Sequence, residues 1–451
     1  MKIKKLFGTK DFYKEAILIA LPIMLQQFVA SFVNLIDNVM IGSVGATALT
    51  SVTVANKFYM VFNSTMFGLC GAAGIFIAQY YGAKNHRRCQ DVFNINLVCC
   101  GLIALFFMTL AMFFPTFILG LFTKTESIMA LGLDYLNVIK YSYLPTSISF
   151  TAMMALRAVG INAIQLKVGV VTVATNTFLN YCLIYGNLGF PVLGVKGAAI
   201  ATLIARIVEM IIYSTLLLRK KHFFFWDFPG MLHLDFKLMK GMFRKAVPLT
   251  ANEIMFSVGM AMIFKSYMRV DEYLVAAITV VDTVINIAFI IFGGLSSAVS
   301  ILIGKRLGAN ELEEARENSV KLIFFGAMVS VAIGIILFIA ARYIPLIYQL
   351  DDTIDATITT LLRIKACLLP VYVVNVCVFF TLRAGGDARS TLIMDSGYLW
   401  GVSVLVSTGL SVFTSIQLVP LFVVVESLDI VKMGLAIYYL KKGTWVRNLT
   451  A

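Results

Sequence analysis

Long apolar runs fill this chain, and polar residues interrupt them at short intervals. Most runs are near or above 18 residues, which as an α-helix is enough to cross a hydrocarbon core about 30 Å thick. Barrel strands would alternate apolar and polar positions in segments of about ten residues, a pattern that this sequence does not show. The pattern predicts an all-α protein with twelve membrane-spanning helices at about residues 15–40, 53–80, 92–114, 131–155, 167–187, 195–218, 243–264, 274–303, 318–341, 358–381, 391–414 and 417–440.

Glycine, proline and arginine positions recur along the chain with a spacing of 226 residues. The recurring positions include Pro22 with Pro248, Gly68 with Gly294, and Leu156-Arg157-Ala158 with Leu382-Arg383-Ala384. Because these residue types fix turns, kinks and membrane borders, the match predicts two copies of one folded unit. We expect lobes at 1–225 and 226–451, with a linker at about 219–242. Six spans per copy make the copies parallel repeats, as in carriers that bind substrate between two lobes.

Composition and charge agree with a lipid environment. Hydrophobic residues make up 60% of the chain and charged residues 14%, whereas about a quarter of the residues in soluble proteins are charged. Most of the 37 Lys and Arg residues fall in the predicted termini and even-numbered loops, which by the positive-inside rule places both termini in the cytoplasm. The sequence therefore predicts a multi-pass protein of the cell membrane, expected to be a monomer. It offers no soluble basic domain for nucleic acid.

Enzymatic and metal chemistry lack their usual residues. All three histidines lie in predicted cytoplasmic loops, and the seven cysteines include no C-x-x-C pair, so no metal site or disulfide framework is expected. No Walker A sequence and no constellation of nucleophile and base is present. We therefore expect no catalytic residue and no resident cofactor, and the protein is not predicted to be an enzyme.

The remaining candidates are polar groups at bilayer depth, where an unpaired carboxylate costs several kcal/mol. Such groups usually face the protein interior and mark a path for ions or substrate. Asp37 lies towards the outer part of span 1, and Gln27 and Asn34 continue a polar stripe beneath it. The stripe favours a functional role for Asp37 in binding an ion or substrate. The alternative is that Asp37 only ends the helix at the outer interface.

The second half offers two further carboxylates. Glu253 in span 7 has Gln27 as its repeat mate, so the same position is ionisable in one copy and neutral in the other. This difference suggests that the copies specialised after duplication. A buried structural hydrogen bond is the alternative for Glu253. Asp282 in span 8 could join Glu253, or it could pair with Lys265 or Arg269.

Amides and paired charges complete the candidates. Asn176 and Asn180 share one face of span 5, and Thr202 in span 6 offers a third side-chain oxygen; hydrogen bonding between helices explains them equally well. Two i, i+3 pairs are interpreted as mutually neutralising, and two repeat-mate arginines as anchors that reach the membrane surface. These residues are Arg206 with Glu209, Asp429 with Lys432, and the arginines Arg157 and Arg383.

Taken together, several short motifs resemble the multidrug and toxic compound extrusion (MATE) family of the MOP superfamily, over nearly the whole chain. The motifs are Asp37-x-x-Met40-Ile41-Gly42, Gln79-x-x-Gly82-Ala83, Leu156-Arg157-Ala158-x-Gly160, Gly194-x-x-Gly197-Ala198-Ala199-x-Ala201-Thr202, Pro248-x-x-x-x-Glu253 and Leu382-Arg383-Ala384-Gly385-Gly386-Asp387. The resemblance implies a secondary exporter that exchanges organic, often cationic, compounds for Na⁺ or H⁺.

The resemblance assigns roles unevenly. Asp37 matches the family's acid in the amino-terminal lobe and Asn176 the amide beside it, while Asn180 stands where the DinF-like branch has a second acid. The chain is therefore nearer the NorM-like pattern. Glu253 resembles the acid of span 7 but lies about one turn nearer the proline. Tyr372 replaces the acid of span 10, so a cation site of the NorM-like type lacks one ligand here.

The mechanism expected from these residues is competition. A buried carboxylate can hold a proton, Na⁺ or a cationic substrate, and each then weakens binding of the others. A flippase for a lipid-linked saccharide is the alternative from the same superfamily, and it predicts a cavity lined with Arg and Lys. A membrane-embedded enzyme or receptor is the alternative from another class. The sequence leaves open the substrate, the coupling ion, the stoichiometry, the lobe that couples and the physiological role.

Overall fold

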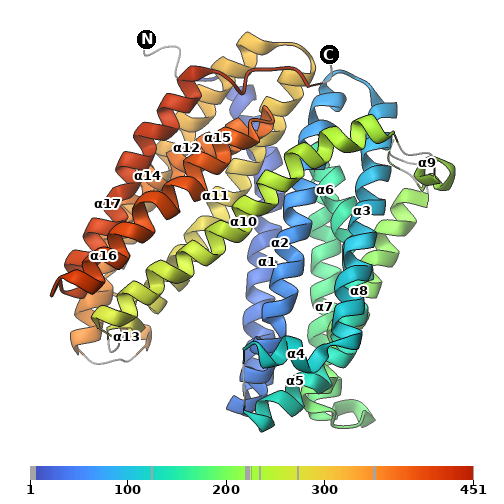
Figure 1. Ribbon diagram of the computed structural model, residues 1–451, viewed down its shortest axis with the longest axis vertical. Helices are drawn as coiled ribbons and strands as arrows, with labels where there is room; N and C mark the ends of the chain where they lie inside the picture. The colour runs from blue at the N-terminus through green and yellow to red at the C-terminus, as the bar shows by residue number, and fades with distance from the viewer. Residues whose placement is uncertain are drawn as a thin grey trace. The chain divides into compact units, whose positions relative to one another are not determined.

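The computed structural model describes residues 7–122, 125–218, 224, 226–232, 235–271, 274–348 and 352–449, without the side chains of 30, 32–35, 38–39, 46, 228, 275–276 and 347–348. The described residues form helices and no strands (Figure 1). The α-helices are α1 (Lys10–Gly42), α2 (Ala46–Gly82), α3 (His86–Phe113), α4 (Pro115–Gly120), α5 (Glu126–Ile139), α6 (Tyr143–Ala158), α7 (Ala163–Tyr185), α8 (Gly194–Leu218), α9 (Phe228–Leu232), α10 (Phe236–Val270), α11 (Val275–Gly308), α12 (Leu312–Ala340), α13 (Pro345–Tyr348), α14 (Asp352–Ala384), α15 (Ala388–Leu392), α16 (Leu405–Phe413) and α17 (Leu418–Lys442).

Every predicted span coincides with helix, so the all-α fold is confirmed. Ten helices within the described ranges are long and apolar enough to cross a membrane. The fourth predicted span misses that length because the 3₁₀ turn η2 (Lys140–Ser142) divides it into α5 and α6. The twelfth, α17, carries charged residues along its length, which lowers its apolar character. Between α15 and α16 the chain forms two π-helical stretches, η4 (Ile393–Gly397) and η5 (Leu399–Val404).

The chain forms two compact units. We call Leu25–Thr250 the first-repeat unit, and Met1–Met24 together with Ala251–Ala451 the second-repeat unit. The division falls inside α1 and α10, two residues after Pro22 and Pro248 respectively. The lobe boundary expected at 225/226 stays a prediction. Part of the expected linker lies outside the described residues, and its end is helical from Phe236.

A close helix crossing recurs at equivalent positions in the two units. A Cβ added to Gly68 of α2 would lie 2.1 Å from Thr250 Oγ1 of α10, and one added to Gly294 of α11 would lie 2.4 Å from Met24 Cγ of α1. Gly68 and Gly294 are repeat mates, and so are Met24 and Thr250. Within each unit, therefore, a helix of one sequence copy contacts the proline-containing helix that begins the other sequence copy, and glycine allows the backbones to approach.

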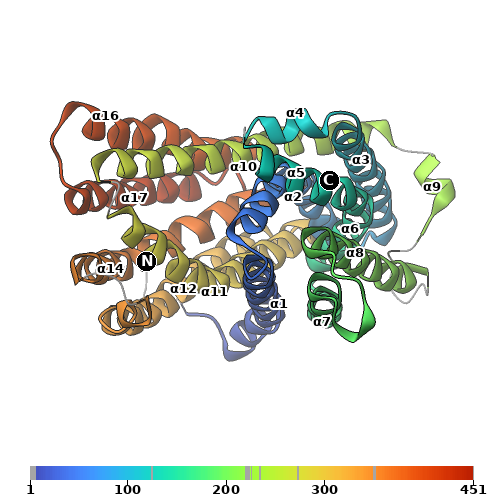
Figure 2. The same ribbon diagram turned by 90° about the horizontal axis from the view of Figure 1, so that it is seen from below.

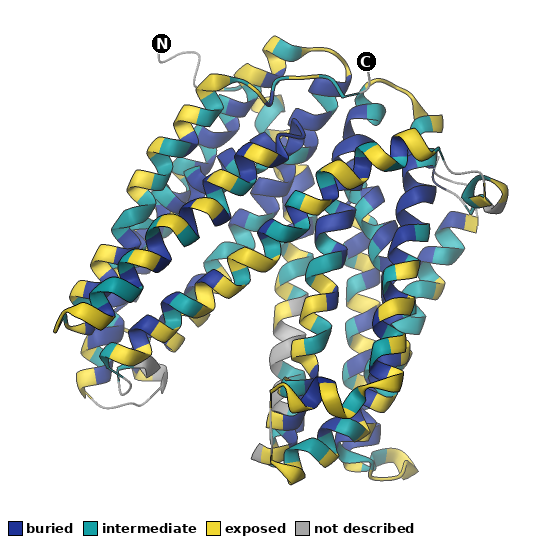
Figure 3. Ribbon diagram, in the orientation of Figure 1, coloured by how far each residue is buried: buried dark blue, intermediate teal, exposed yellow. Residues whose placement is uncertain are grey.

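Within each unit the side chains separate by burial. In the first-repeat unit α7 packs along α8, and in the second α14 contacts α11, α12 and α17 (Figure 2). Buried residues face the neighbouring helices, while the outer helix faces are exposed and include large apolar side chains such as Leu102, Phe106 and Ile336 (Figure 3). Apolar outer faces are expected of helices that lie against lipid.

Candidate functional site

The first-repeat unit gathers an acid and two amides from helices α1 and α7. Asn180 Nδ2 donates to Asp37 Oδ1 at 2.7 Å. The Asn176 amide lies 2.9 and 3.0 Å from the two carboxylate oxygens and donates to both when its NH₂ group faces Asp37. Because Asn176 and Asn180 are four residues apart, both amides lie on the same face of α7, as the sequence predicts.

Further polar groups lie beside the two amides. The Asn176 amide and the Thr202 hydroxyl of α8 are 3.3 Å apart, and Asn180 lies 3.4 Å from Asn176. Asn176 and Asn180 are buried, and Asn180 Oδ1 has no hydrogen-bond partner among the described residues. Carboxylate, amide and hydroxyl oxygens are the ligands that hard cations prefer, and a carboxylate can also take a proton. The cluster can therefore hold a small positive ion.

A fixed charge pair borders the acid–amide cluster. Arg206 Nη1 lies 2.9 Å from Glu209 Oε2, which confirms the predicted pair in α8. Arg206 also acts electrostatically on Asp37, although the two form no ion pair. Nearby, the Tyr135 hydroxyl is 3.5 Å from Asn56 Oδ1. Arg206 is therefore balanced by Glu209, and Asp37 forms no ion pair with another described residue.

The polar stripe predicted beneath Asp37 is only partly visible. Gln27 is half-buried on α1, and the neighbouring Gln26, not Gln27, has a described contact, with its Nε2 atom 3.2 Å from Met153 Sδ. The side chain of Asn34 lies outside the described residues. The roles proposed for Gln27 and Asn34 thus stay predictions.

In the second-repeat unit Glu253 is not an isolated carboxylate. Its Oε1 atom lies 3.0 Å from Arg383 Nη1, and the Arg383 side chain is only 5% exposed. Arg383 is therefore not an anchor that reaches the membrane surface, and that interpretation is wrong for this copy: a buried guanidinium needs a carboxylate partner. Asp282 forms no ion pair with Lys265 or Arg269. The charges that act on it are Lys365 and Glu426, and its side chain is exposed.

The second-repeat unit also contains charged residues that sequence reasoning missed. Lys365 Nζ lies 2.7 Å from Glu426 Oε2, and the Tyr372 hydroxyl donates to the same oxygen. A carboxylate of span 12 therefore contacts Tyr372, the residue that stands where the NorM-like pattern has an acid. Lys365 and Glu426 both lie inside predicted spans. The search for charged groups at bilayer depth that singled out Asp37 would therefore have found them.

A second missed carboxylate, Asp395, lies in the π-helical stretch η4. Lys432 Nζ is 2.6 Å from Asp395 Oδ1, and Asn252 Nδ2 donates to its other oxygen at 3.1 Å. The direct ion pair predicted between Lys432 and Asp429 is therefore wrong, although the two charges still act on each other. Spacing along one helix indicated Asp429, but the packing of α17 against the π-helical segment brings Asp395 closer.

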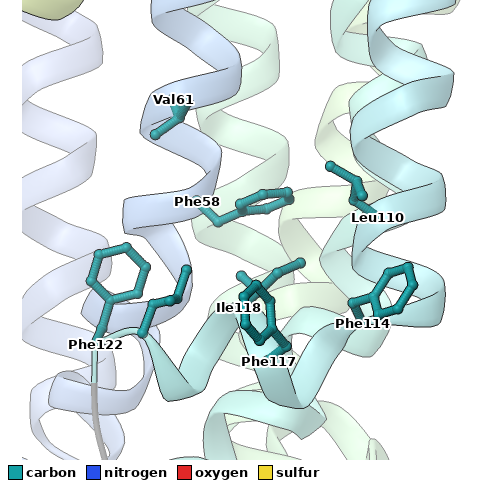
Figure 4. Close-up of a pocket in the computed structure, with 8 residues that line it drawn as sticks. Phe58, Val61, Leu110, Phe114, Phe117, Ile118 and Phe122 are labelled. Carbon is teal, nitrogen blue, oxygen red and sulfur yellow. The ribbon is translucent and has the colours of Figure 1, made fainter.

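An apolar cavity in the first-repeat unit is separate from these polar groups (Figure 4). It has a volume of about 540 Å³ and lies where α2, α3 and α4 meet. Every lining side chain is hydrocarbon, so the cavity offers no group that could bind an ion. Its lining residues are Phe58, Val61, Leu110, Phe114, Phe117, Ile118, Leu121 and Phe122.

Comparison with known proteins agrees with the repeat. The family model MatE matches residues 22–182 and again residues 248–408, two matches offset by the same 226 residues. The probable multidrug resistance protein YoeA of Bacillus subtilis (strain 168) is 24% identical over 409 residues, covering 90% of this chain and 88% of that protein. The probable multidrug resistance protein NorM of Thermotoga maritima is 22% identical over 449 residues, covering 96% and 93%.

A solved structure has the same fold. A multidrug resistance MATE family transporter of the MOP superfamily, described in an outward-facing conformation, superposes with a TM-score of 0.86 at 17% identity and covers 98% of both chains. The duplicated helical unit, the carboxylates within membrane-spanning helices and the double family match lead to one conclusion. This chain is a multi-pass membrane protein of the MATE family of transporters, which move small molecules and are not enzymes.

Proposed function

We propose that this protein exports organic, cationic compounds from the cytoplasm in exchange for Na⁺ or H⁺, by alternating access, and that Asp37 is the residue that couples the two. It would work in the cell membrane as a monomer with both termini in the cytoplasm. The single observation that carries the proposal is the acid–amide cluster of Asp37, Asn176 and Asn180. The names of the relatives, multidrug resistance proteins, support the choice of substrate class.

The chemistry of the cluster suits competition between two cations. Amide groups that donate to the carboxylate hold it in place, and Thr202 and the unpartnered Asn180 Oδ1 supply further oxygens. A proton or Na⁺ that neutralises Asp37 would remove the charge that attracts a cationic substrate. Linkage makes the effect reciprocal, so each ligand lowers the affinity for the other and shifts the population of states.

Asp37 is a better coupling residue than Glu253 for an electrostatic reason. Glu253 already has the guanidinium of Arg383 at 3.0 Å, and a carboxylate held by a fixed cation gains little from a mobile one. Asp37 has amide partners at similar distances, which orient it without cancelling its charge. This comparison favours the first-repeat unit as the coupling unit.

The test is transport in proteoliposomes of a fluorescent organic cation, with Na⁺ and pH gradients imposed separately. Wild-type protein should transport under one of the two gradients. Asp37→Asn should reduce gradient-driven transport to the level of empty liposomes while inserting normally, because asparagine keeps the shape but cannot be charged. Asp134→Asn, an exposed acid of the same unit, is the matched control and should leave transport unchanged. Undiminished transport by the Asp37→Asn protein would exclude Asp37 from coupling.

The flippase alternative receives no specific support. It predicts a cavity lined with Arg and Lys instead of carboxylates, whereas Lys365, Lys432 and Arg383 each have a carboxylate within 3.0 Å. It stays a prediction that the same proteoliposomes can test with a lipid-linked saccharide.

A further inference from the structure

The second-repeat unit holds an ammonium group between two aromatic rings and a carboxylate. Lys365 Nζ lies 2.7 Å from Glu426 Oε2, 5.1 Å from the centre of the Tyr372 ring and 5.4 Å from that of Phe422. Lys365 and Tyr372 are two turns apart on α14, and Phe422 and Glu426 one turn apart on α17, so each pair shares a helix face. We call Glu426, Tyr372 and Phe422 the ammonium cage.

The composition of this cage is that of a receptor for organic ammonium ions. A cation within about 6 Å of a ring centre is attracted by the ring quadrupole, and aromatic cages recognise methylated ammonium ions in this way. The carboxylate adds a charge-assisted hydrogen bond. An ordinary buried ion pair would need only one partner for Lys365, so the rings point to selectivity for a cation that carries carbon.

A third aromatic residue borders the cage with an unused hydrogen-bonding group. The Tyr267 ring of α10 lies 5.7 Å from the Phe422 ring, and the residue is 4% exposed. Its hydroxyl is buried and has no hydrogen-bond partner among the described residues. Leaving such a group unpaired costs about 1–3 kcal/mol, so a ligand that pairs with it would be stabilised.

A neighbouring carboxylate, Asp282, is an alternative ion-pair partner for Lys365. Asp282 of α11 is exposed, forms no ion pair with another described residue, and is acted on by the charges of Lys365 and Glu426. A lysine stem is long and flexible, so its ammonium can exchange one nearby carboxylate for another. If an incoming ammonium ion paired with Glu426, the Lys365 ammonium could pair with Asp282 instead. Both carboxylates and both cations would then have a partner.

We propose that the ammonium cage is a binding site for small organic ammonium ions, and that Lys365 is its built-in ligand, which an incoming ammonium ion displaces towards Asp282. In the ligand-free protein Lys365 fills the cage and keeps Glu426 neutralised. Because Lys365 pairs with Glu426, the ligand-free protein has no destabilising unpaired charge at this buried carboxylate.

Chemical rescue tests the proposal. Lys365→Ala removes the side chain from Cγ to Nζ, and n-propylammonium ion has the atoms that are lost. The dissociation constant of propylammonium, measured from the rise in the thermal unfolding midpoint of the purified protein, should be at least about tenfold lower for Lys365→Ala than for wild type. Adding Glu426→Gln to the variant should abolish the effect.

The pair of Lys432 and Asp395 is the matched control. Both lysines have side chains that are 13% exposed, and each pairs with a carboxylate of the same unit. Lys432, however, has no ring contact among the described residues, and the Asn252 amide donates a hydrogen bond to its partner Asp395. Lys432→Ala should show no gain in propylammonium affinity. Equal gains in both variants, or no gain in Lys365→Ala, would overturn the proposal.

A second measurement covers the case in which Lys365→Ala does not fold. Tetramethylammonium binding to wild-type protein can be compared with binding to Glu426→Gln, and a loss of at least about fivefold is expected. Equal binding would reject the cage. Since the readout is binding, it is independent of Asp37, and failure of the transport proposal would leave the result unaffected.

Discussion

At the scale of single residues, the immediate partners of a carboxylate decide whether it can take a mobile cation. Asp37 faces amides, whereas Glu253 faces Arg383 and Glu426 faces Lys365. All three are acids within predicted membrane spans, and the sequence alone does not rank them. The ranking depends on the charge of the neighbouring side chain, because an ion pair in a low-dielectric interior satisfies both members.

Glu253→Gln tests this ranking. The substitution leaves the buried guanidinium of Arg383 without its counter-charge, so we expect the free energy of unfolding to fall by about 1–3 kcal/mol. Transport should still respond to the coupling ion. Thermal unfolding and proteoliposome transport check the two parts, and the double variant with Arg383→Gln should recover part of the lost stability. Full stability together with lost ion dependence would instead assign coupling to Glu253.

At the scale of elements, two glycines set how closely helices cross. The sequence repeat identifies Gly68 and Gly294 as equivalent, but only the packing shows that their partners, Thr250 and Met24, are themselves repeat mates on the proline-containing helices α10 and α1. The positions matter because backbone atoms lie within reach: Thr250 Cα would be 2.6 Å from a Cβ on Gly68, and Ala20 O would be 2.8 Å from one on Gly294. Backbone cannot move aside as a side-chain tip can.

Alanine substitutions should separate these crossings from ordinary glycines. Gly68→Ala and Gly294→Ala should each lower the free energy of unfolding by about 1–3 kcal/mol through overpacking. Gly101→Ala and Gly409→Ala are the controls, since a Cβ at either position meets nothing within 4 Å. Thermal unfolding of the four purified variants is the measurement. Similar unfolding midpoints for all four would show that the crossings are not tightly packed.

At the scale of the whole molecule, two copies of one unit have acquired unlike polar interiors. The family match repeats at a fixed offset, yet Asp37 corresponds to Ile263 and Glu426 to Ile200. The first-repeat unit has an acid with amides, and the second has acids paired with lysines and an arginine. Duplication preserved the helical scaffold, whose packing depends on apolar volume, while the costly buried charges diverged between the copies.

Orientation in the membrane is the prediction for the whole molecule. Because Lys and Arg gather in the termini and even-numbered loops, epitope tags at either terminus should be cut by protease only in inside-out vesicles. A tag inserted at η3 (Asn187–Gly189), in an odd-numbered loop, should show the opposite pattern and serves as the control. Cleavage of a terminal tag in sealed right-side-out vesicles would contradict the predicted orientation and place that terminus outside the cell.

The sequence by itself determined the helices and the duplication, because apolar run length and the spacing of glycine and proline depend on local geometry and on the thickness of the membrane. The resemblance of its short motifs indicated the family. The sequence also indicated that Asn176 and Asn180 share a face, since that follows from helical periodicity. Only the tertiary structure decided which acid meets which partner. Asn180 reaches Asp37 from 143 residues away and Lys365 reaches Glu426 from 61, and such contacts depend on how helices pack, which hydrophobic patterning leaves open.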